Sequence, residues 1–470
     1  MTVRKLALIN PVNRLRTGFT VNRSSRFPPL GLGMVASFTP ATWEVELVDE
    51  NFEPFTYRDA DLVGITAFTS SANRAYEIAA RYKEQGVPVV MGGIHASMCP
   101  EEALRFVDAV VIGEVKSVWT KVLGDVVSGR LQAVYRGDWQ SLIDLKQVRR
   151  DIYHDQYMFA SMQTSRGCPL DCDFCSVTEF NGRRYRRRPP AQVLDELETI
   201  PQELIFFVDD NIIGYGPQDR EQALAMFKGM VERGVNKHWF CQASVNIADD
   251  QEILEWASRA GCRMIFLGIE AEDIDALAAV NKRLNLKRGV SAYTRTYDRI
   301  HAAGIAVLGA FIFGMDSDTP EKLYRRADYM INSGIDVMQA TAMTPLPGTR
   351  LFRQMKEEGR LLYTDFPQDW DRYNLTEVVY RPKGMEPGQF SQIMRDCLRR
   401  IFDLPVIKAK AKQTFKETGR ADTTEFAWQS NINYRNIAMA DSTFAGDRVL
   451  SCVDNVSTGN SGGIVRADLV

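Results

Sequence analysis

The sequence "SRGCPLDCDFCS", residues 165–176, carries three cysteines within eight positions: Cys168, Cys172 and Cys175. A structural zinc site uses four closed ligands, and a ferredoxin-like iron–sulfur cluster uses four cysteines. The remaining cysteines are scattered along the chain without cluster spacing: Cys99, Cys241, Cys262, Cys397 and Cys452. The triplet therefore predicts a metal centre that three thiolates hold and that keeps one coordination position open.

Strands and helices are predicted to alternate around this triplet. One apolar strand precedes it near residues 159–164, and others follow near 204–210, 238–244, 263–270, 307–314 and 337–345. Such consecutive strand–helix units predict a parallel (β/α) barrel, or part of one, over residues 150–365. Polar residues stand at the predicted carboxyl ends of the strands, where barrels bind ligands: Asp209, Asp210, Gln242, Ser244 and Glu270.

The N-terminal part of the chain, residues 1–140, shows a second strand–helix alternation. The stretches "KLALIN", "WEVELVDE", "DLVGITAF", "VPVVMGG" and "DAVVIGE" read as strands between helices. This order predicts an α/β fold with a doubly wound parallel sheet. Ligands of such sheets lie beyond the carboxyl ends of the strands, and those ends carry Asp49, Thr66, Gly92, Gly93 and Gly113.

The spacing CxxxCxxC, with Phe174 before the last cysteine at the opening of a barrel, resembles the radical S-adenosylmethionine (SAM) superfamily. The resemblance implies a 4Fe–4S cluster on the three cysteines, with a free iron that chelates SAM. Electron transfer from the cluster cleaves SAM in that family and usually releases a 5′-deoxyadenosyl radical. A zinc clip or free thiols is the alternative interpretation of the same cysteines.

The same resemblance implies contacts to SAM, for which strand caps and surface contacts are the alternative. Asp209 is expected at the methionine amino group, and Glu270 at the ribose. Gln242 and Ser244 resemble ribose or carboxylate contacts, and Lys282 a cation for the methionine carboxylate. Cys241, in "WFCQAS", is expected to point toward the barrel mouth as a catalytic candidate, or else to be a small buried hydrophobe.

The N-terminal unit resembles the cobalamin-binding domain that precedes many of these barrels. The resemblance rests on "FPPLGLGMVAS", "DLVGITAFTSS", "VVMGGIHAS" and "DAVVIGE". Cobalamin domains with a histidine ligand carry D-x-H-x-x-G, whereas "VDENFEP" places Asn51 where the histidine is expected. The domain is therefore expected either to bind cobalamin without a protein histidine or to have lost the cofactor.

The C-terminal segment, residues 371–470, is expected to be mainly helical. The stretch "DWDRYNLTEVVY" suits a wall that closes the barrel and shapes a substrate site, and a helical appendage is the alternative. The arginine-rich stretch "GRRYRRR", residues 182–188, fits an acidic small substrate or packing against the N-terminal unit.

Composition limits the partners and the compartment. The formal net charge is -3 and the pI is about 6.0, which gives no support for nucleic-acid binding. No apolar stretch approaches the roughly 20 residues of a membrane span, and the cysteine pattern indicates reduced thiols. We expect a cytoplasmic protein that uses a small-molecule substrate and an electron donor such as ferredoxin or flavodoxin.

The architecture favours cobalamin-assisted C-methylation of a natural product, lipid or tetrapyrrole-like molecule. If cobalamin is absent, ring formation or transfer of the 3-amino-3-carboxypropyl group of SAM is expected instead. Transfer to arsenite in arsinothricin-type biosynthesis is one such case, with Cys241 as a soft ligand. A cofactor-binding sensor without turnover is an alternative from another class, and the polar residues at the barrel mouth argue against it.

Overall fold

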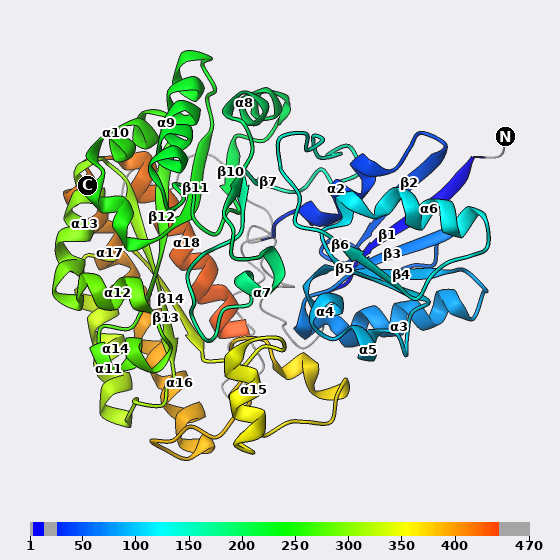
Figure 1. Ribbon diagram of the computed structural model, residues 1–470. Helices are drawn as coiled ribbons and strands as arrows, with labels where there is room; N and C mark the ends of the chain where they lie inside the picture. Colours follow the sequence, from blue (N-terminus) through cyan, green and yellow to red (C-terminus); the bar gives the residue numbers. More distant parts are fainter. Residues whose placement is uncertain (1–2, 14–25, 441–470) are drawn as a thin grey trace.

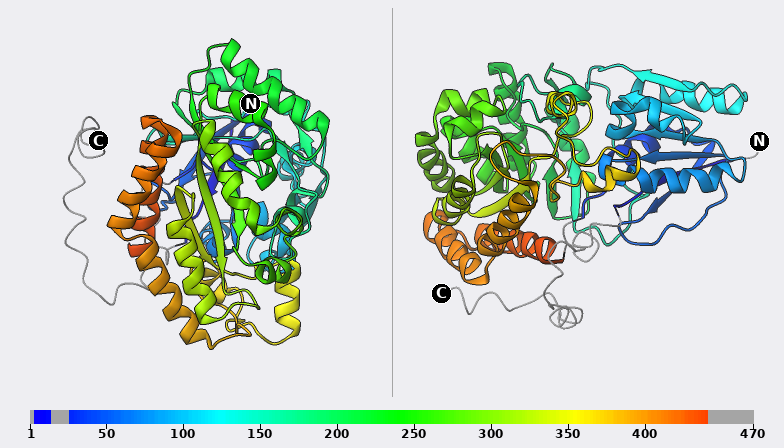
Figure 2. Two further views of the ribbon diagram at one scale, coloured as in Figure 1. Left: turned by 90° about the vertical axis from the view of Figure 1, so that its left-hand side faces the viewer. Right: turned by 90° about the horizontal axis from the view of Figure 1, so that it is seen from below.

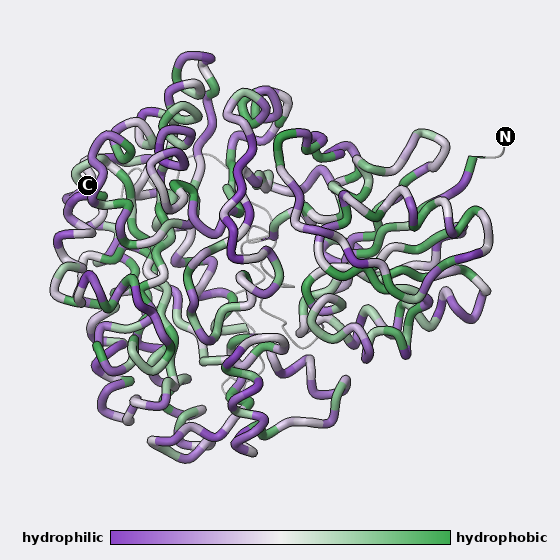
Figure 3. Tube along the Cα trace, in the orientation of Figure 1, coloured by the Kyte–Doolittle hydropathy of each residue, from purple (hydrophilic) through white to green (hydrophobic). Residues whose placement is uncertain are grey.

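The computed structural model describes residues 3–13 and 26–440 and shows two parallel sheets beside each other (Figure 1). Each sheet has six strands, and each is wrapped by helices that follow its strands in the sequence. Figure 3 shows hydrophobic stretches along the strands, as expected for strands that are buried on both faces. The α/β prediction is therefore confirmed.

The first sheet has the strand order β2-β1-β3-β4-β5-β6, with every neighbouring pair parallel. Its strands are β1 (Arg4–Asn10), β2 (Trp43–Asp49), β3 (Leu62–Thr66), β4 (Val89–Gly92), β5 (Ala109–Gly113) and β6 (Val134–Gly137). Helices α2 (Leu30–Phe38) and α6 (Trp119–Val127) cover one face. Helices α3 (Ala72–Lys83), α4 (Gly93–Met98) and α5 (Pro100–Ala103) cover the other face. The order reverses between β1 and β3, which confirms the doubly wound prediction.

The second sheet has the strand order β14-β13-β12-β11-β10-β7 and is also parallel throughout. Its strands are β7 (Phe159–Met162), β10 (Leu204–Phe207), β11 (His238–Ala243), β12 (Cys262–Glu270), β13 (Ala306–Phe313) and β14 (Val337–Ala342). Because β7 and β14 do not pair, the barrel is partial, as predicted.

Helices cover the outer face of the partial barrel. They are α8 (Pro190–Thr199), α9 (Pro217–Glu232), α10 (Gln251–Arg259), α11 (Ile274–Ala279), α12 (Arg283–Arg288), α13 (Tyr293–Ala302) and α14 (Pro320–Asn332). The side chains that the strands turn outward form one large core with these helices. The inner face carries an aromatic group instead, in which the rings of Phe206 and Phe240 stack at 4.3 Å between centroids.

A short irregular segment lies between the two sheets and carries the cysteines (Figure 1). It contains a small antiparallel pair, β8 (Ser165–Arg166) with β9 (Arg186–Arg187), and helix α7 (Val177–Asn181). Glu114, just after β5, forms two ion pairs with this segment. Its carboxylate oxygens lie 2.6 Å from an Arg186 guanidinium nitrogen and 3.1 Å from one of Arg166. The arginine-rich stretch therefore packs against the N-terminal unit, which is one of its two predicted roles.

The C-terminal segment is mainly helical, with α16 (Pro387–Ile401), α17 (Leu404–Thr418) and α18 (Ala421–Ala440) after α15 (Arg350–Glu357). Figure 2 shows α16 and α17 alongside the barrel, where α16 packs on α14 and α17 on α13. Helix α18 crosses the amino ends of β12 to β14, and Phe426 contacts the inner aromatic group. These helices therefore do not stand over the barrel mouth, and residues 441–470 of the predicted cap lie outside the described residues.

The start of the predicted cap, residues 371–375, and the turn just before it pack against the first sheet. Trp370 and Tyr373 pack into the core of the first sheet, and the Trp370 indole N–H lies 3.0 Å from both carboxylate oxygens of Glu102. Searched over the same described residues, the chain has no helix that is both long and apolar enough to cross a bilayer.

Candidate functional site

The three cysteines of the triplet converge on one small cavity beyond the carboxyl end of β7. Its volume is about 160 Å³. Most of the predicted site residues of the barrel share this cavity with the cysteines: Phe174, Gln242, Ser244, Glu270 and Lys282. Asp210, which the sequence places at the strand end without a role, also lines it, and so does Tyr215, which the sequence does not point to.

The cysteine loop is held by contacts from outside itself. Arg350, the first residue of α15, donates to Asp171 Oδ1 and Asp173 Oδ1, each at 2.8 Å. The Asn281 amide donates to the carbonyl of Asp171 at 2.6 Å, and Cys168 N–H donates to the carbonyl of Gly182 at 3.1 Å. These bonds position the thiols before any metal binds, because they fix the backbone that carries them.

The chemistry of these donors fits an iron–sulfur cluster. Burial raises the pKa of each cysteine thiol, and it raises the pKa of Cys175 to about 12. A bound metal overcomes this, because a coordinating thiol loses its proton. No fourth cysteine lines the cavity among the described residues. Three thiolates thus fit a 4Fe–4S cluster in which one iron remains available to another ligand.

Glu270 and Lys282 form a buried ion pair opposite the cysteines. Lys282 Nζ lies 2.6 Å from Glu270 Oε1 and 5.9 Å from the ring centre of Phe174. Burial lowers the pKa of Lys282, but the charge and hydrogen bond of Glu270 together with the neighbouring Cys172 and Cys175 outweigh burial, so the net pKa of Lys282 is raised. A Cβ at Gly268 would lie 2.8 Å from Lys282 Nζ, so the glycine makes room for the pair.

Asp209 does not face this cavity, contrary to the prediction of a contact with the methionine amino group. Its buried carboxylate accepts bonds from Thr164 N at 3.0 Å, Thr164 Oγ1 at 2.7 Å and the Ser165 hydroxyl. It therefore ties the residues before the cysteine loop to the end of β10. The neighbouring Asp210 lines the cavity instead, and burial raises the pKa of Asp210 to about 6.

Cys241 also lies elsewhere than predicted. It is 1% exposed, and it packs in the core between the strands and the outer helices. Gln242, the next residue, points to the cavity because successive side chains of a strand face opposite sides. This position matches the buried-hydrophobe alternative and removes Cys241 from the candidate catalytic residues.

A second, larger cavity lies between the two sheets and has a volume of about 980 Å³. Four of the five predicted ligand positions of the first sheet line it: Thr66, Gly92, Gly93 and Gly113. Asp49 does not, because its buried carboxylate accepts from the Asn10 amide and the Tyr157 hydroxyl. Gly93 has φ +86°, and a Cβ there would lie 2.5 Å from Thr66 Oγ1. Gln163, Arg166 and Arg188 of the barrel contribute to the wall, and so do Tyr373, Asn374 and Leu375. This open, glycine-bordered space fits a large planar cofactor.

No histidine lines the larger cavity among the described residues. His95 lies in α4, just beyond the carboxyl end of β4, where a cobalt ligand could stand. It is buried, however, and its Nε2 lies 3.2 Å from Glu102 Oε1 and 3.0 Å from the Tyr76 hydroxyl. Asn51 does line the cavity, and its amide donates to the Tyr157 hydroxyl at 2.9 Å. A cofactor in this cavity therefore receives no imidazole from the described lining.

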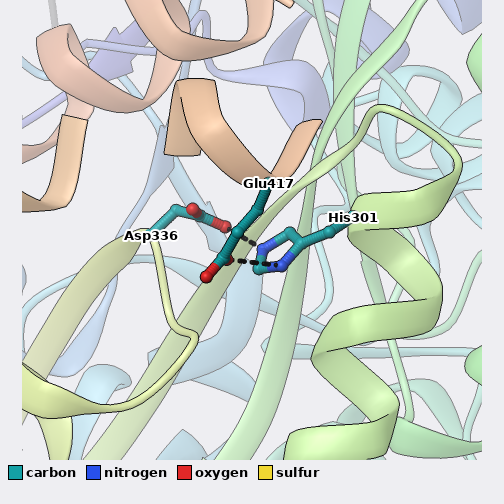
Figure 4. A group of neighbouring side chains, drawn as sticks. All are labelled: His301, Asp336 and Glu417. Carbon is teal, nitrogen blue, oxygen red and sulfur yellow. Dashed lines mark hydrogen bonds and ion pairs between the residues drawn. The ribbon is translucent and has the colours of Figure 1, made fainter. Parts of the chain in front are cut away.

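Another group with metal-ligand residue types lies away from both cavities (Figure 4). His301 Nε2 is 2.7 Å from Asp336 Oδ2, and His301 Nδ1 is 2.8 Å from Glu417 Oε2. Both ring nitrogens are thus engaged by carboxylates, which leaves no lone pair for a metal. Burial lowers the pKa of His301, but the charge and hydrogen bond of Asp336 together with the charge of Glu417 outweigh burial, so the net pKa is raised. The group is an imidazolium between two carboxylates rather than a metal site.

Comparisons with protein families agree with this geometry. The family model of the radical SAM superfamily matches residues 162–330, which include the cysteines and most of the barrel. The model of the B12 binding domain matches residues 16–123, which include most of the first sheet. The chain is a radical SAM enzyme with an N-terminal cobalamin-binding domain. Membership implies a 4Fe–4S cluster, SAM and cobalamin as cofactors.

Relatives of this radical SAM enzyme include two methyltransferases. The bacteriochlorophyllide d C-12(1)-methyltransferase of Chlorobaculum tepidum is 29% identical over 81% of this chain and 84% of that protein. The hopanoid C-2 methylase of Rhodopseudomonas palustris is 31% identical over 72% of this chain and 66% of that protein.

Solved structures share the fold of the radical SAM enzyme at low sequence identity. The cobalamin-dependent SAM radical enzyme OxsB, with aqua-cobalamin and SAM bound, matches with a TM-score of 0.68 and 14% identity, over 93% of this chain and 72% of that chain. The methyltransferase TsrM of Kitasatospora setae, with cobalamin and a [4Fe-4S] cluster bound, matches with a TM-score of 0.63 and 16% identity. The match covers 91% of this chain and 99% of that chain.

In the radical SAM enzyme the two cavities have different lining residues, and their walls are in contact. The smaller cavity holds the cysteines and the polar residues assigned to SAM. The larger one holds the strand ends assigned to cobalamin. Asn181, in the wall of the larger cavity, donates to Asp210 in the wall of the smaller one at 3.3 Å. Sequence reasoning missed this contact because no periodicity connects α7 with the end of β10.

Proposed function

We propose that this enzyme methylates a carbon atom of an apolar small molecule. The observation that carries the proposal is the adjacency of the two cavities across Asn181 and Asp210. When bound, the cluster and SAM supply a hydrogen-abstracting radical, and cobalamin supplies a methyl group. A substrate at this boundary lies within reach of both. The methyltransferase names of the relatives support the same reaction.

The walls of the larger cavity support an apolar substrate. Many of its lining side chains are hydrocarbon or aromatic: Leu8, Phe27, Leu32, Phe68, Phe180, Val208, Leu346 and Leu375. Two of the arginines that line it are engaged by carboxylates: Arg166 pairs with Glu114 at 3.1 Å, and Arg188 pairs with Glu196 at 2.7 Å. These two guanidinium groups are therefore held by the protein itself, and much of the remaining wall is apolar.

The polar residues of the smaller cavity have a binding role in this proposal. Glu270 and Lys282 present a carboxylate and an ammonium to the same space, which suits the ribose hydroxyls and the carboxylate of SAM. Asp210 supplies a carboxylate for the amino group, in the role first assigned to Asp209. Phe174 and the surrounding barrel exclude water from the reacting atoms, which protects a radical from side reactions.

The experiment is an anaerobic assay with the enzyme reconstituted with iron, sulfide and cobalamin. It is given SAM with a deuterated methyl group, dithionite and an apolar extract of the source cells. We expect 5′-deoxyadenosine, S-adenosylhomocysteine and an extract component that gains the labelled methyl group. The Cys172→Ala variant should form none of the three. Labelled SAM that yields 5′-deoxyadenosine without S-adenosylhomocysteine or labelled product would contradict methyl transfer.

Ring formation is the second candidate function. Among the relatives is a protein named anaerobic magnesium-protoporphyrin IX monomethyl ester cyclase from Rubrivivax gelatinosus, which is 24% identical over 81% of this chain and 74% of that protein. A cyclase would release 5′-deoxyadenosine and transfer no methyl group, so the same assay separates the two. Transfer of the aminocarboxypropyl group would instead leave methylthioadenosine, and Cys241 is not placed to take part in it.

A further inference from the structure

Tyr215 makes a contact to the cysteine loop that the proposed function does not use. It lies in the loop between β10 and α9, and its hydroxyl oxygen is 2.9 Å from Cys168 Sγ. Neither Cys172 nor Cys175 has a side-chain donor at hydrogen-bond distance in the described part of the chain. The contact therefore singles out one of the three cluster ligands.

The position of Tyr215 is fixed by its surroundings. Its backbone N–H donates to Asp219 Oδ2 at 3.0 Å, at the start of α9. Its ring packs edge-on against Tyr185, with 5.5 Å between the ring centres. The Tyr185 hydroxyl donates in turn to the carbonyl of Asn211 at 2.8 Å. These contacts hold the Tyr215 side chain with its hydroxyl next to Cys168 Sγ.

The direction of the hydrogen bond follows from the charges. A tyrosine phenol ordinarily has a pKa of about 10 and carries its proton at neutral pH. A cluster-bound cysteine is a thiolate and can only accept. The hydroxyl therefore donates to the sulfur of Cys168 when the cluster is bound.

We infer that Tyr215 is a positioning residue that acts through Cys168 to raise the reduction potential of the cluster. Reduction adds one electron, from a low-potential one-electron donor, and increases the negative charge on the cluster and its sulfur ligands. A hydrogen bond to a ligand sulfur stabilises the more negative state. No covalent bond to Tyr215 forms or breaks. The inference goes beyond methyl transfer, because it concerns the cluster whatever the substrate is.

The test compares midpoint potentials of the cluster in the reconstituted full-length enzyme without substrate. Dithionite titration followed by electron paramagnetic resonance measures each midpoint. For Tyr215→Phe we expect the reduction equilibrium constant to fall by up to about tenfold, which corresponds to about 59 mV for a one-electron couple. Iron content should match the unmodified enzyme. An unchanged midpoint at full iron content would overturn the inference.

Tyr185→Phe is the matched control, because it removes a phenol from the same packed pair without touching sulfur. Its midpoint should equal that of the unmodified enzyme, and an equal shift in both variants would refute a role of the sulfur contact. If Tyr215→Phe assembles less iron, replacement of Tyr215 by 3-fluorotyrosine decides the question. The fluorinated phenol is a stronger donor, so a higher midpoint supports the inference and an unchanged one overturns it. None of these measurements requires turnover, so their outcome is separate from that of the methylation assay.

Discussion

At the scale of single residues, the pair of Glu270 and Lys282 is the strongest test of the smaller cavity as the SAM site. The two groups are buried 2.6 Å apart, and we assign both to SAM. Lys282→Met removes the cation and leaves the Glu270 carboxylate unpaired. We expect SAM affinity to fall by about 2 kcal/mol, or roughly thirtyfold. Equilibrium binding of SAM to the reconstituted enzyme measures this effect.

Lys287→Met is the control for that prediction, since Lys287 is exposed on α12 and lines neither cavity. It should bind SAM as the unmodified enzyme does. Both variants should retain their iron, because the cysteine loop is held by Arg350 and Asn281. Unchanged SAM affinity in Lys282→Met would show that the ammonium serves only the fold.

Residue-scale prediction from the sequence succeeded where the information was local. The cysteine spacing is contained in a few positions, and the structure places all three thiols on one cavity. Asp209 and Asp210 are adjacent, and neighbouring residues of an extended chain face opposite sides. An error of one position therefore selects Asp209, whose buried carboxylate holds the cysteine segment, instead of Asp210, whose carboxylate lines the cavity. Cys241 and Gln242 differ for the same reason.

At the scale of elements, the buried group of His301, Asp336 and Glu417 joins α13, the start of β14 and α17 (Figure 4). Asp336 also accepts from Val307 N–H and from the Thr414 hydroxyl, each at 2.7 Å. His301→Gln leaves buried carboxylate charge uncompensated. We expect a loss of about 3 kcal/mol in the free energy of unfolding at pH 6, measured by urea denaturation.

The pH dependence of this group has a defined sign. The pKa of His301 is raised in the folded protein: burial lowers it, but the charge and hydrogen bond of Asp336 together with the charge of Glu417 outweigh burial. Its stabilising contribution is therefore fully present below the unfolded pKa of about 6.5 and is lost as pH rises through the raised folded value. The stability difference between the unmodified protein and His301→Gln should shrink at alkaline pH. His238→Gln, at the exposed start of β11, should show the opposite trend, because burial lowers the pKa of His238.

The order of strands and helices could be predicted because buried parallel strands read as apolar runs between amphipathic segments. The location of α18 could not. The sequence of α18 mixes apolar and polar residues, and its location depends on tertiary hydrogen bonds. The Asn431 side-chain amide donates to the carbonyl of Asp336 at 2.8 Å and accepts from Met338 N–H at 3.2 Å. Those partners are about ninety positions away in the sequence. The local pattern of apolar and polar residues therefore cannot predict these contacts.

At the scale of the whole molecule, Glu114 links the two sheets. It is 5% exposed at its side chain and binds Arg166 and Arg186 of the cysteine segment. Glu114→Gln leaves two buried guanidinium groups without their anion, which is costly. We expect the two halves to separate more readily, with loss of bound cobalamin on gel filtration and faster proteolysis of the segment between β6 and β7.

The control for that prediction is Glu101→Gln, which changes an exposed carboxylate of α5 on the same domain. It should retain cobalamin and resist protease as the unmodified protein does. Because the larger cavity takes its wall from both halves, cobalamin retention reports their closure directly. Full retention in Glu114→Gln would show that other contacts, such as that of Trp370 with Glu102, suffice.

The different construction of the two cavities has a consequence for how such enzymes diversify. The smaller cavity is built by the barrel alone, whereas the larger one is assembled from three stretches of chain that are far apart in sequence. Substitutions in the latter alter what fits without disturbing radical generation, so selection acts on the two nearly independently. We therefore expect related enzymes to keep the residues of the smaller cavity and to vary those of the larger cavity. Relatives at similar identity carry different names, one for a bacteriochlorophyllide and one for a hopanoid.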